Sequence, residues 1–206
     1  MSVRLIIFDF DGVIADSFSN FYPMIRDSMA SVRISISEKQ YRTLFLGNVH
    51  QEFKNFINND EKYKKFSDYR TAHYSDYYES LIFPNAANFL KNIKMQGHKM
   101  AICSSGKKET VLKTLKINRL DNIFDIILAT SEYTKEIMIK KAMAKFKLNE
   151  AIFVTDTVGD IKTAKEVGLK TIAVTWGFHS AKMLESAKPD FIANSFSVLT
   201  SIIFKR

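Results

Sequence analysis

The sequence contains a single cysteine, Cys103, among its 206 residues, so it can form no internal disulfide. No stretch approaches the roughly 18–20 apolar residues that a membrane span requires. Asp9 interrupts the first apolar run, which does not fit a secretory signal. There are also no internal repeats and no low-complexity tract. Together these absences predict a soluble protein of the cytoplasm with no membrane partner.

Histidine is scarce as well, with four residues that show no metal-ligand spacing and are therefore expected in surface or packing roles. The net charge of +8 and the pI of about 9.4 suggest either an anionic partner or a basic surface that aids solubility. The lysines are scattered rather than clustered, which makes nucleic acid an unlikely partner. The aromatic segment at residues 62–80 could stack on nucleic acid, but helix packing is the favoured interpretation.

Five apolar segments are typical of buried strands. Most are continuous runs, as expected for parallel strands that are covered on both faces. They lie at residues 5–10, 99–104, 124–130, 151–156 and 170–176. Helical patterns separate the later ones, at residues 85–96, 107–117, 136–146 and 159–167, and Gly97 and Gly168 stand where helices should end. Residues 191–193 are expected to add a short strand before a C-terminal helix.

This alternation predicts an α/β fold with a Rossmann-like, mainly parallel sheet. Residues 16–83 depart from it, because they hold helical material without a clear buried strand. A segment of this length is too long for a simple loop. We therefore expect a core domain at residues 1–15 and 84–206, with an inserted helical cap domain at residues 16–83.

Polar residues gather where the predicted strands end. Asp9 and Asp11 follow the first strand, "CSSG" ends the second, and "VTDTVGD" follows the fourth. Open α/β sheets bind ligands at this edge. The candidate residues there are Asp9, Asp11, Ser104, Ser105, Gly106, Lys135, Asp156 and Asp160.

These residue types suit phosphoryl transfer. Crowded carboxylates need a hard cation, and Mg²⁺ prefers oxygen ligands. A hydroxyl and backbone N–H groups at a helix start can hold an anion, and a lysine adds positive charge. An aspartate in such a site can act as the nucleophile.

Four segments, taken in order, resemble the motifs of the haloacid dehalogenase (HAD) superfamily, in its branch with a helical cap after the first strand. They are "DFDGVIADS", "AICSSG", "KEIMIKKAM" and "FVTDTVGDIKTAKEVGLKTIAVTWG". The resemblance covers nearly the whole chain. It implies an Mg²⁺-dependent phosphatase that acts on a small phosphorylated metabolite, either as a monomer or as a homodimer. "DFDGVIADS" together with "TWGFHS" is most similar to the phosphoglycolate phosphatase group.

The resemblance also implies roles for single residues. Asp9 would attack phosphorus and bind the metal, while Asp11 would protonate the leaving group, activate water and offer its backbone carbonyl to the metal. Asp156 would be the main acidic ligand. Asp160 would act as a ligand through water or as its support, or alternatively as a helix-start acid.

The remaining roles concern the phosphoryl group. Ser104 would hold one of its oxygens with the N–H groups of Ser105 and Gly106, although the serine assignment could shift by one residue. Lys135 would neutralise the charge of the phosphoryl group. Lys140 and Lys141 are alternatives for this role, because Glu136 stands where many relatives have proline. Thr155 stands where relatives often carry glycine.

Three alternatives to the phosphatase stay open. One is a mutase of the β-phosphoglucomutase type, which is disfavoured because Phe21 occupies the place of a cap histidine. Another is a phosphatase of nucleotides or nucleic-acid ends, which the positive charge motivates. The last is a non-catalytic binding protein with the HAD fold.

Overall fold

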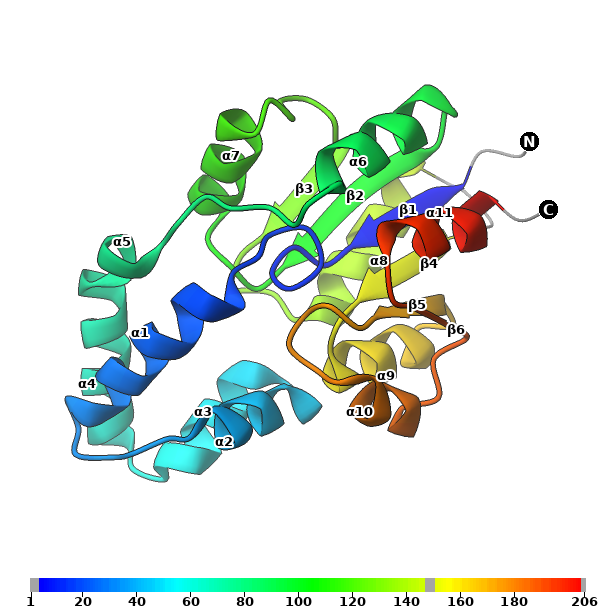
Figure 1. Cartoon of the computed structure of the whole chain (residues 1–206). Helices are drawn as coiled ribbons and strands as arrows, with labels where there is room; N and C mark the ends of the chain where they lie inside the picture. Colours follow the sequence, from blue (N-terminus) through cyan, green and yellow to red (C-terminus); the bar gives the residue numbers. More distant parts are fainter. Residues whose placement is uncertain (1–3, 147–150, 205–206) are drawn as a thin grey trace. The chain divides into compact units, whose positions relative to one another are not determined.

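The computed structural model describes residues 4–146 and 151–204 (Figure 1). The remaining residues, which include both ends of the expected core domain, lie outside the described part. The chain divides into two compact units. We call Met1–Asp16 with Ser80–Arg206 the core unit, and Ser17–Glu79 the helical unit.

The core unit contains a six-stranded sheet in which every neighbouring pair is parallel. Its order is β3-β2-β1-β4-β5-β6, so β1 lies between β2 and β4. The strands are β1 (Leu5–Phe8), β2 (Lys99–Ser104), β3 (Ile126–Ala129), β4 (Ala151–Thr155), β5 (Lys170–Val174) and β6 (Phe191–Ala193). The predicted α/β class with a parallel sheet is therefore confirmed.

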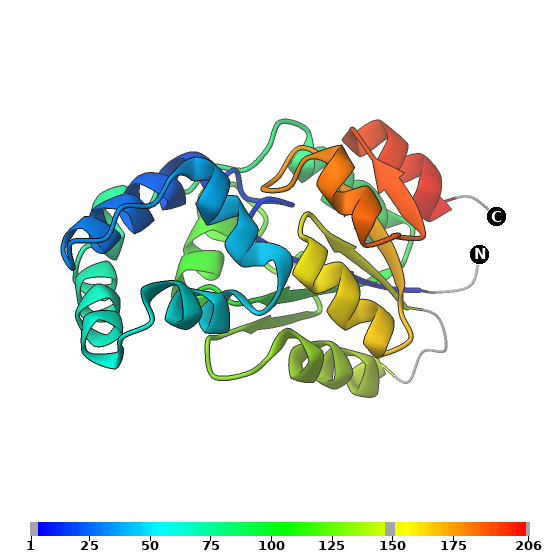
Figure 2. The same cartoon turned by 90° about the horizontal axis from the view of Figure 1, so that it is seen from below.

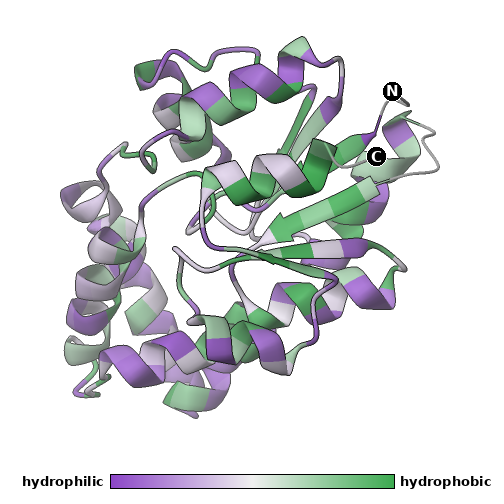
Figure 3. Ribbon diagram, turned by 45° about the vertical axis from the view of Figure 1, so that its right-hand side comes forward, coloured by the Kyte–Doolittle hydropathy of each residue, from purple (hydrophilic) through white to green (hydrophobic). Residues whose placement is uncertain are grey.

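Helices cover both faces of this sheet, as Figures 1 and 2 show. They are α6 (Ala86–Met95), α7 (Lys108–Ile117), α8 (Lys135–Phe146), α9 (Val158–Glu166), α10 (Ala181–Ser186) and α11 (Phe196–Phe204). On one face Ile6 and Phe8 pack with residues of α6, α7 and α11, and on the other Leu5 and Ile7 pack with residues of α8 and α9. This double burial explains why the strands are continuously apolar, and they appear mostly green in Figure 3.

Strand and helix ends differ from the predicted ones by a few residues. β1 stops at Phe8 rather than at residue 10, because the Phe10 carbonyl instead accepts hydrogen bonds from the N–H groups of Ile14 and Ala15, both at 2.9 Å. β5 likewise stops at Val174 rather than at residue 176. The six-residue helix α10 was not predicted, since it is too short to show a periodic pattern.

Gly97 and Gly168 follow α6 and α9 with φ of +78° and +77°. Residues rarely adopt this left-handed conformation unless they lack a Cβ. The prediction that these two glycines end helices is confirmed.

The helical unit contains α1 (Phe18–Ala30), α2 (Glu38–Thr43), a 3₁₀ turn (Leu44–Leu46), α3 (Val49–Ile57), α4 (Asp60–Ala72) and α5 (Tyr74–Tyr77). Side chains of Ser37, Asn48 and Asn59 accept hydrogen bonds from the first turns of α2, α3 and α4. Phe66 is fully buried, and its ring centroid lies 5.2 Å from that of Phe53. This ring of the 62–80 segment therefore packs inside the unit, as the favoured interpretation requires.

Within residues 4–146 and 151–204, no helix combines the length and apolarity needed to cross a membrane.

Candidate active site

The first part of the site is the loop that follows β1. The Asp9 N–H continues the strand ladder by donating to the Val154 carbonyl at 2.9 Å. The carboxylate of Asp9 accepts a 2.7 Å hydrogen bond from the N–H of Phe10, and the residue is only 8% exposed. Asp9 is thus buried at the carboxyl edge of the sheet in a fixed orientation.

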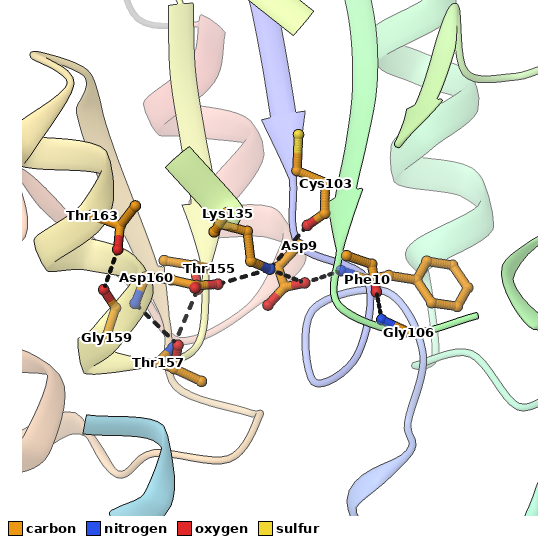
Figure 4. Close-up of polar contacts among 11 residues, drawn as sticks. Asp9, Phe10, Cys103, Gly106, Lys135, Thr155, Thr157, Gly159, Asp160 and Thr163 are labelled. Atoms are coloured by element: carbon orange, nitrogen blue, oxygen red, sulfur yellow. Dashed lines mark hydrogen bonds and ion pairs between the residues drawn. The ribbon is translucent and has the colours of Figure 1, made fainter. Parts of the chain in front are cut away.

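Lys135, the first residue of α8, joins three neighbouring segments through its ammonium group. Its Nζ lies 2.8 Å from Oδ1 of Asp9, 3.0 Å from Oδ2 of Asp160 and 2.9 Å from the Cys103 carbonyl oxygen (Figure 4). Of the three candidate lysines, Lys135 is the one at the site. Lys140 pairs with Glu136 on the same helix, and Lys141 lies over the ring of Tyr133.

Asp156, directly after β4, is fully buried. Its Oδ2 accepts a 2.7 Å hydrogen bond from the N–H of Phe178, whereas its Oδ1 has no hydrogen-bond partner in the described part of the chain. A Cβ at Gly12 would lie 2.0 Å from Oδ2 of Asp156, and a Cβ at Gly177 would lie 2.3 Å from it. Two glycines therefore leave the space that this carboxylate occupies.

The loop between β2 and α7 carries the predicted hydroxyls. Ser104 is 1% exposed, and its Oγ accepts a 3.0 Å hydrogen bond from the N–H of Gly106. A Cβ at Gly106 would lie 3.1 Å from this oxygen and 3.2 Å from Oδ2 of Asp11, which places the Asp11 carboxylate beside the loop. α7 begins after Lys107, without a side-chain cap, so neither Ser104 nor Ser105 caps this helix.

Asp160 lies in the first turn of α9 and contacts Lys135 through Oδ2. Its N–H donates to the Thr157 hydroxyl at 3.4 Å, and the same Oδ2 accepts from the Thr155 hydroxyl at 3.2 Å. The structure thus brings all eight candidate positions to one edge of the sheet, at the ends of β1, β2 and β4 and at the starts of α8 and α9.

Burial dominates the electrostatics of Asp9 and Asp156. It raises the pKa of Asp9 well above its ordinary value, and the charges of Asp160 and Asp156 raise it further, while Lys135 opposes them. Burial also raises the pKa of Asp156 to about 7, against the hydrogen bond from the N–H of Phe178. Burial alone would lower the pKa of Lys135, but Asp160 and Asp9 together raise it.

The site thus crowds buried carboxylates around one ammonium group. Cys103 takes no part through its thiol, because burial raises its pKa to about 12 and keeps it neutral.

The described residues fit a magnesium ion by donor chemistry. They contain no group of three or more His, Cys, Asp or Glu side chains arranged to hold a metal. Mg²⁺ commonly uses only one or two carboxylates and completes its shell with water and substrate phosphate oxygens. Burying a carboxylate oxygen without a partner is unfavourable, and Oδ1 of Asp156 is buried in this way. This oxygen is therefore available as a ligand to a cation.

Sequence reasoning missed three residues that shape the site. Gly177 makes room for Asp156, Phe178 donates its N–H to it, and the Nδ1 of His179 accepts a 3.0 Å hydrogen bond from the N–H of Val158. The "WGFH" segment after β5 carried a signal, since a strand of this sheet must end at the same edge. The histidines vary in exposure: His98 and His179 are buried, whereas His50 and His73 are partly exposed.

Comparison with known proteins gives consistent results. Curated relatives named pyrophosphatase PpaX, from Bacillus thuringiensis and Bacillus cereus, are 25% and 27% identical over 216 residues, covering 98% of this chain and 97% of theirs. A haloacid dehalogenase-like family hydrolase from Streptococcus pneumoniae superimposes with a TM-score of 0.82 at 22% identity, covering 98% of both chains. A structure described as a predicted phosphoglycolate phosphatase, from Haemophilus somnus, has a TM-score of 0.79 at 21% identity over 98% of each chain.

The sequence model of a family described as haloacid dehalogenase-like hydrolase matches residues 6–174, a stretch that includes all eight candidate positions. The protein therefore belongs to the haloacid dehalogenase-like hydrolases.

Proposed function

We propose that the protein is an Mg²⁺-dependent phosphatase that hydrolyses a small phosphate monoester through an aspartyl-phosphate intermediate. The observation that carries this proposal is the setting of Asp9. Its carboxylate is held by the N–H of Phe10 and the ammonium of Lys135, and the Asp11 carboxylate lies beside the Ser104–Gly106 loop. A nucleophile, a proton donor and a phosphate-binding loop therefore share one edge of the sheet.

The first half of the reaction breaks the ester. An oxygen of the Asp9 carboxylate attacks phosphorus, and the bond from phosphorus to the leaving-group oxygen breaks. Asp11 gives its proton to that oxygen, so the oxygen departs as a hydroxyl group. Ser104 and the N–H groups of Ser105 and Gly106 hold phosphoryl oxygens.

The second half restores Asp9. Asp11, now a carboxylate, takes a proton from water, whose oxygen attacks phosphorus. The bond between phosphorus and Asp9 breaks, and inorganic phosphate departs. Lys135 balances the negative charge of Asp9 and the phosphoryl oxygens throughout.

Asp9, Asp156 and the backbone carbonyl of Asp11 would hold the magnesium ion, with Asp160 in support. When bound, the ion supplies positive charge that offsets the repulsion between the phosphoryl group and the carboxylates. We further propose that the helical unit is the cap domain predicted at residues 16–83, and that it excludes water and recognises the leaving group.

We infer a substrate whose leaving group is itself anionic. The relatives' names give two substrates, the monoester phosphoglycolate and the anhydride pyrophosphate, and in both the part that departs carries a negative charge. We propose Arg70 of the helical unit as the residue that recognises this negative charge. It lies over the rings of Phe66 and Phe53 and forms no ion pair within the described residues, whereas Arg42 of α2 pairs with Glu38 at 2.8 Å.

The decisive experiment measures phosphate release from 2-phosphoglycolate, pyrophosphate, sugar phosphates and nucleoside monophosphates, with Mg²⁺ or with chelator. We expect Mg²⁺-dependent release that Asp9→Asn abolishes and that Asp121→Asn, the same change at an exposed loop, leaves intact. Release by Asp9→Asn at the wild-type rate would refute the mechanism.

A second arm tests the substrate class. Arg70→Met should lower kcat/KM for the anionic-leaving-group substrate by about ten- to a hundredfold, the value of a hydrogen bond to a charged group. It should leave p-nitrophenyl phosphate hydrolysis unchanged, and Arg42→Met should affect neither. An equal loss on both substrates would contradict the assignment of Arg70.

The alternatives give distinct results in the same assays. The mutase would require a bisphosphate activator; at the cap-histidine position Phe21 instead lies among aromatic rings, with its centroid 6.2 Å from that of Tyr74. A nucleic-acid-end phosphatase would release phosphate from 3′- or 5′-phosphorylated oligonucleotides. A binding protein would hold ligand without hydrolysing any ester.

A further inference from the structure

Thr155, the last residue of β4, makes contacts that its position in the sheet does not require. The residue is fully buried. Its hydroxyl donates to Oδ2 of Asp160 at 3.2 Å and accepts from the N–H of Thr157 at 3.3 Å (Figure 4). Both hydrogen-bonding functions of the hydroxyl are therefore used, which fixes its orientation.

The acceptor of this hydrogen bond is the oxygen that holds Lys135. Oδ2 of Asp160 lies 3.0 Å from Nζ of Lys135, and the same Nζ lies 2.8 Å from Oδ1 of Asp9. A continuous polar chain therefore runs from Thr155 through Asp160 and Lys135 to Asp9. All four groups are at least largely buried, so no bulk water replaces a contact that is lost.

Helix capping does not account for Thr155. Thr157 is the N-cap of α9, and its own hydroxyl accepts from the N–H of Asp160. The two hydroxyls therefore bind different parts of Asp160. That of Thr157 accepts from its backbone N–H, and that of Thr155 donates to its carboxylate. Valine would fill the same space at the end of the buried strand, but it could not donate a hydrogen bond to the Asp160 carboxylate.

We propose that Thr155 is a positioning residue that acts through Asp160 to hold the ammonium of Lys135 against Asp9. The proposal rests on the proposed function for its kinetic consequences. The placement of Lys135, which the proposal predicts, can be measured without any substrate.

The test compares Thr155→Val, which removes the hydroxyl, with Thr155→Ser, which keeps it. Thr163→Val is the matched control, because the Thr163 hydroxyl bonds the Gly159 carbonyl within the same helix α9 at 3.1 Å and touches no acid of the site (Figure 4). Thr155→Ala serves if the valine variant does not fold.

The first readout is independent of activity. The ¹⁵N resonance and proton-exchange rate of the Lys135 ammonium report its ion pairs. We expect Thr155→Val to shift the resonance and speed exchange, Thr155→Ser to keep both close to wild type, and Thr163→Val to change neither. An unchanged Lys135 signal in Thr155→Val would overturn the proposal whether or not a substrate is known.

The second readout is kinetic. We expect Thr155→Val to lower kcat for phosphate release at least tenfold, as for loss of one hydrogen bond to a charged group. Thr155→Ser should restore most of kcat. Equal losses in Thr155→Ser and Thr155→Val would overturn the proposal, because a packing defect would then explain both. If the wild-type protein released no phosphate from any substrate, the proposed function would be refuted. The Lys135 ammonium measurement would then decide the positioning role of Thr155 by itself.

Discussion

Replacing Gly177 by alanine should damage the site through a single methyl group. Its Cβ would lie 2.3 Å from Oδ2 of Asp156, 2.4 Å from the Gly12 carbonyl oxygen and 2.5 Å from Cβ of Asp156. Attractive contacts have their optimum at about 3.5–4.0 Å, so each of these contacts must lengthen by about 1 Å or more. The loop after β5, which carries Gly177, would have to move away from the loops after β1 and β4.

The expected magnitude follows from overpacking. Extra methylene groups in a packed interior typically cost about 1–3 kcal/mol. At about 2–4 °C per kcal/mol for a chain of this size, the melting temperature should fall by roughly 2–12 °C. A displacement of about 1 Å in a catalytic group can lower turnover about 100-fold.

Gly168→Ala separates the clash from general destabilisation. Gly168 has a φ of +77° and no atom within 4 Å of an added Cβ, so alanine there meets backbone strain alone. That strain costs about 1–2 kcal/mol. Calorimetry should show comparable losses for the two variants, while phosphate release and Mn²⁺ binding should fall only in Gly177→Ala. Wild-type release and Mn²⁺ affinity in Gly177→Ala would refute the steric reasoning.

Three further results are expected. Lys135→Met should abolish phosphate release and lower the melting temperature, because removing one partner of a buried ion pair typically costs about 3–5 kcal/mol; a variant as stable and active as wild type would contradict the assignment. Burial raises the pKa of Asp125, but a backbone N–H and two lysines hold it below its ordinary value. Its stabilising effect should therefore be present above about pH 4 and be lost as pH falls further, so wild type and Asp125→Asn should differ in melting temperature at pH 6 and converge below pH 4. Chelator should stop phosphate release, and Asp156→Asn should weaken Mn²⁺ binding in a direct titration; undiminished binding would exclude Asp156 as a ligand.

Most of the sheet could be predicted from its apolar runs. A strand that is covered on both faces buries successive residues and is therefore apolar along its length, as the fully buried β1 is. The ends were less predictable, because Phe10 is as apolar as Phe8 yet turns out of the strand. α10 could not be predicted from periodicity, since its six residues span fewer than two turns.

The site was predictable where chemistry and strand ends coincide, as at Asp9 and Asp156. The choice among Lys135, Lys140 and Lys141 needed the structure. It shows that the ammonium of Lys135, at the start of α8, lies against Asp9. Gly177 and Thr155 were not foreseen as site residues. Their roles depend on the distance between loops that are far apart in sequence, which spacing along the chain does not encode.

The position of β1 has a consequence for the order of events during synthesis. β1 spans Leu5–Phe8, and both of its neighbours lie far along the chain, β2 at Lys99–Ser104 and β4 at Ala151–Thr155. A nascent chain therefore carries an apolar strand with neither partner while the contiguous helices of Ser17–Glu79 emerge and form their local contacts. We expect the helical unit to gain structure first on the ribosome. The strand that leads to Asp9 keeps at least one edge open to chaperones and to misassembly until both β2 and β4 have been made.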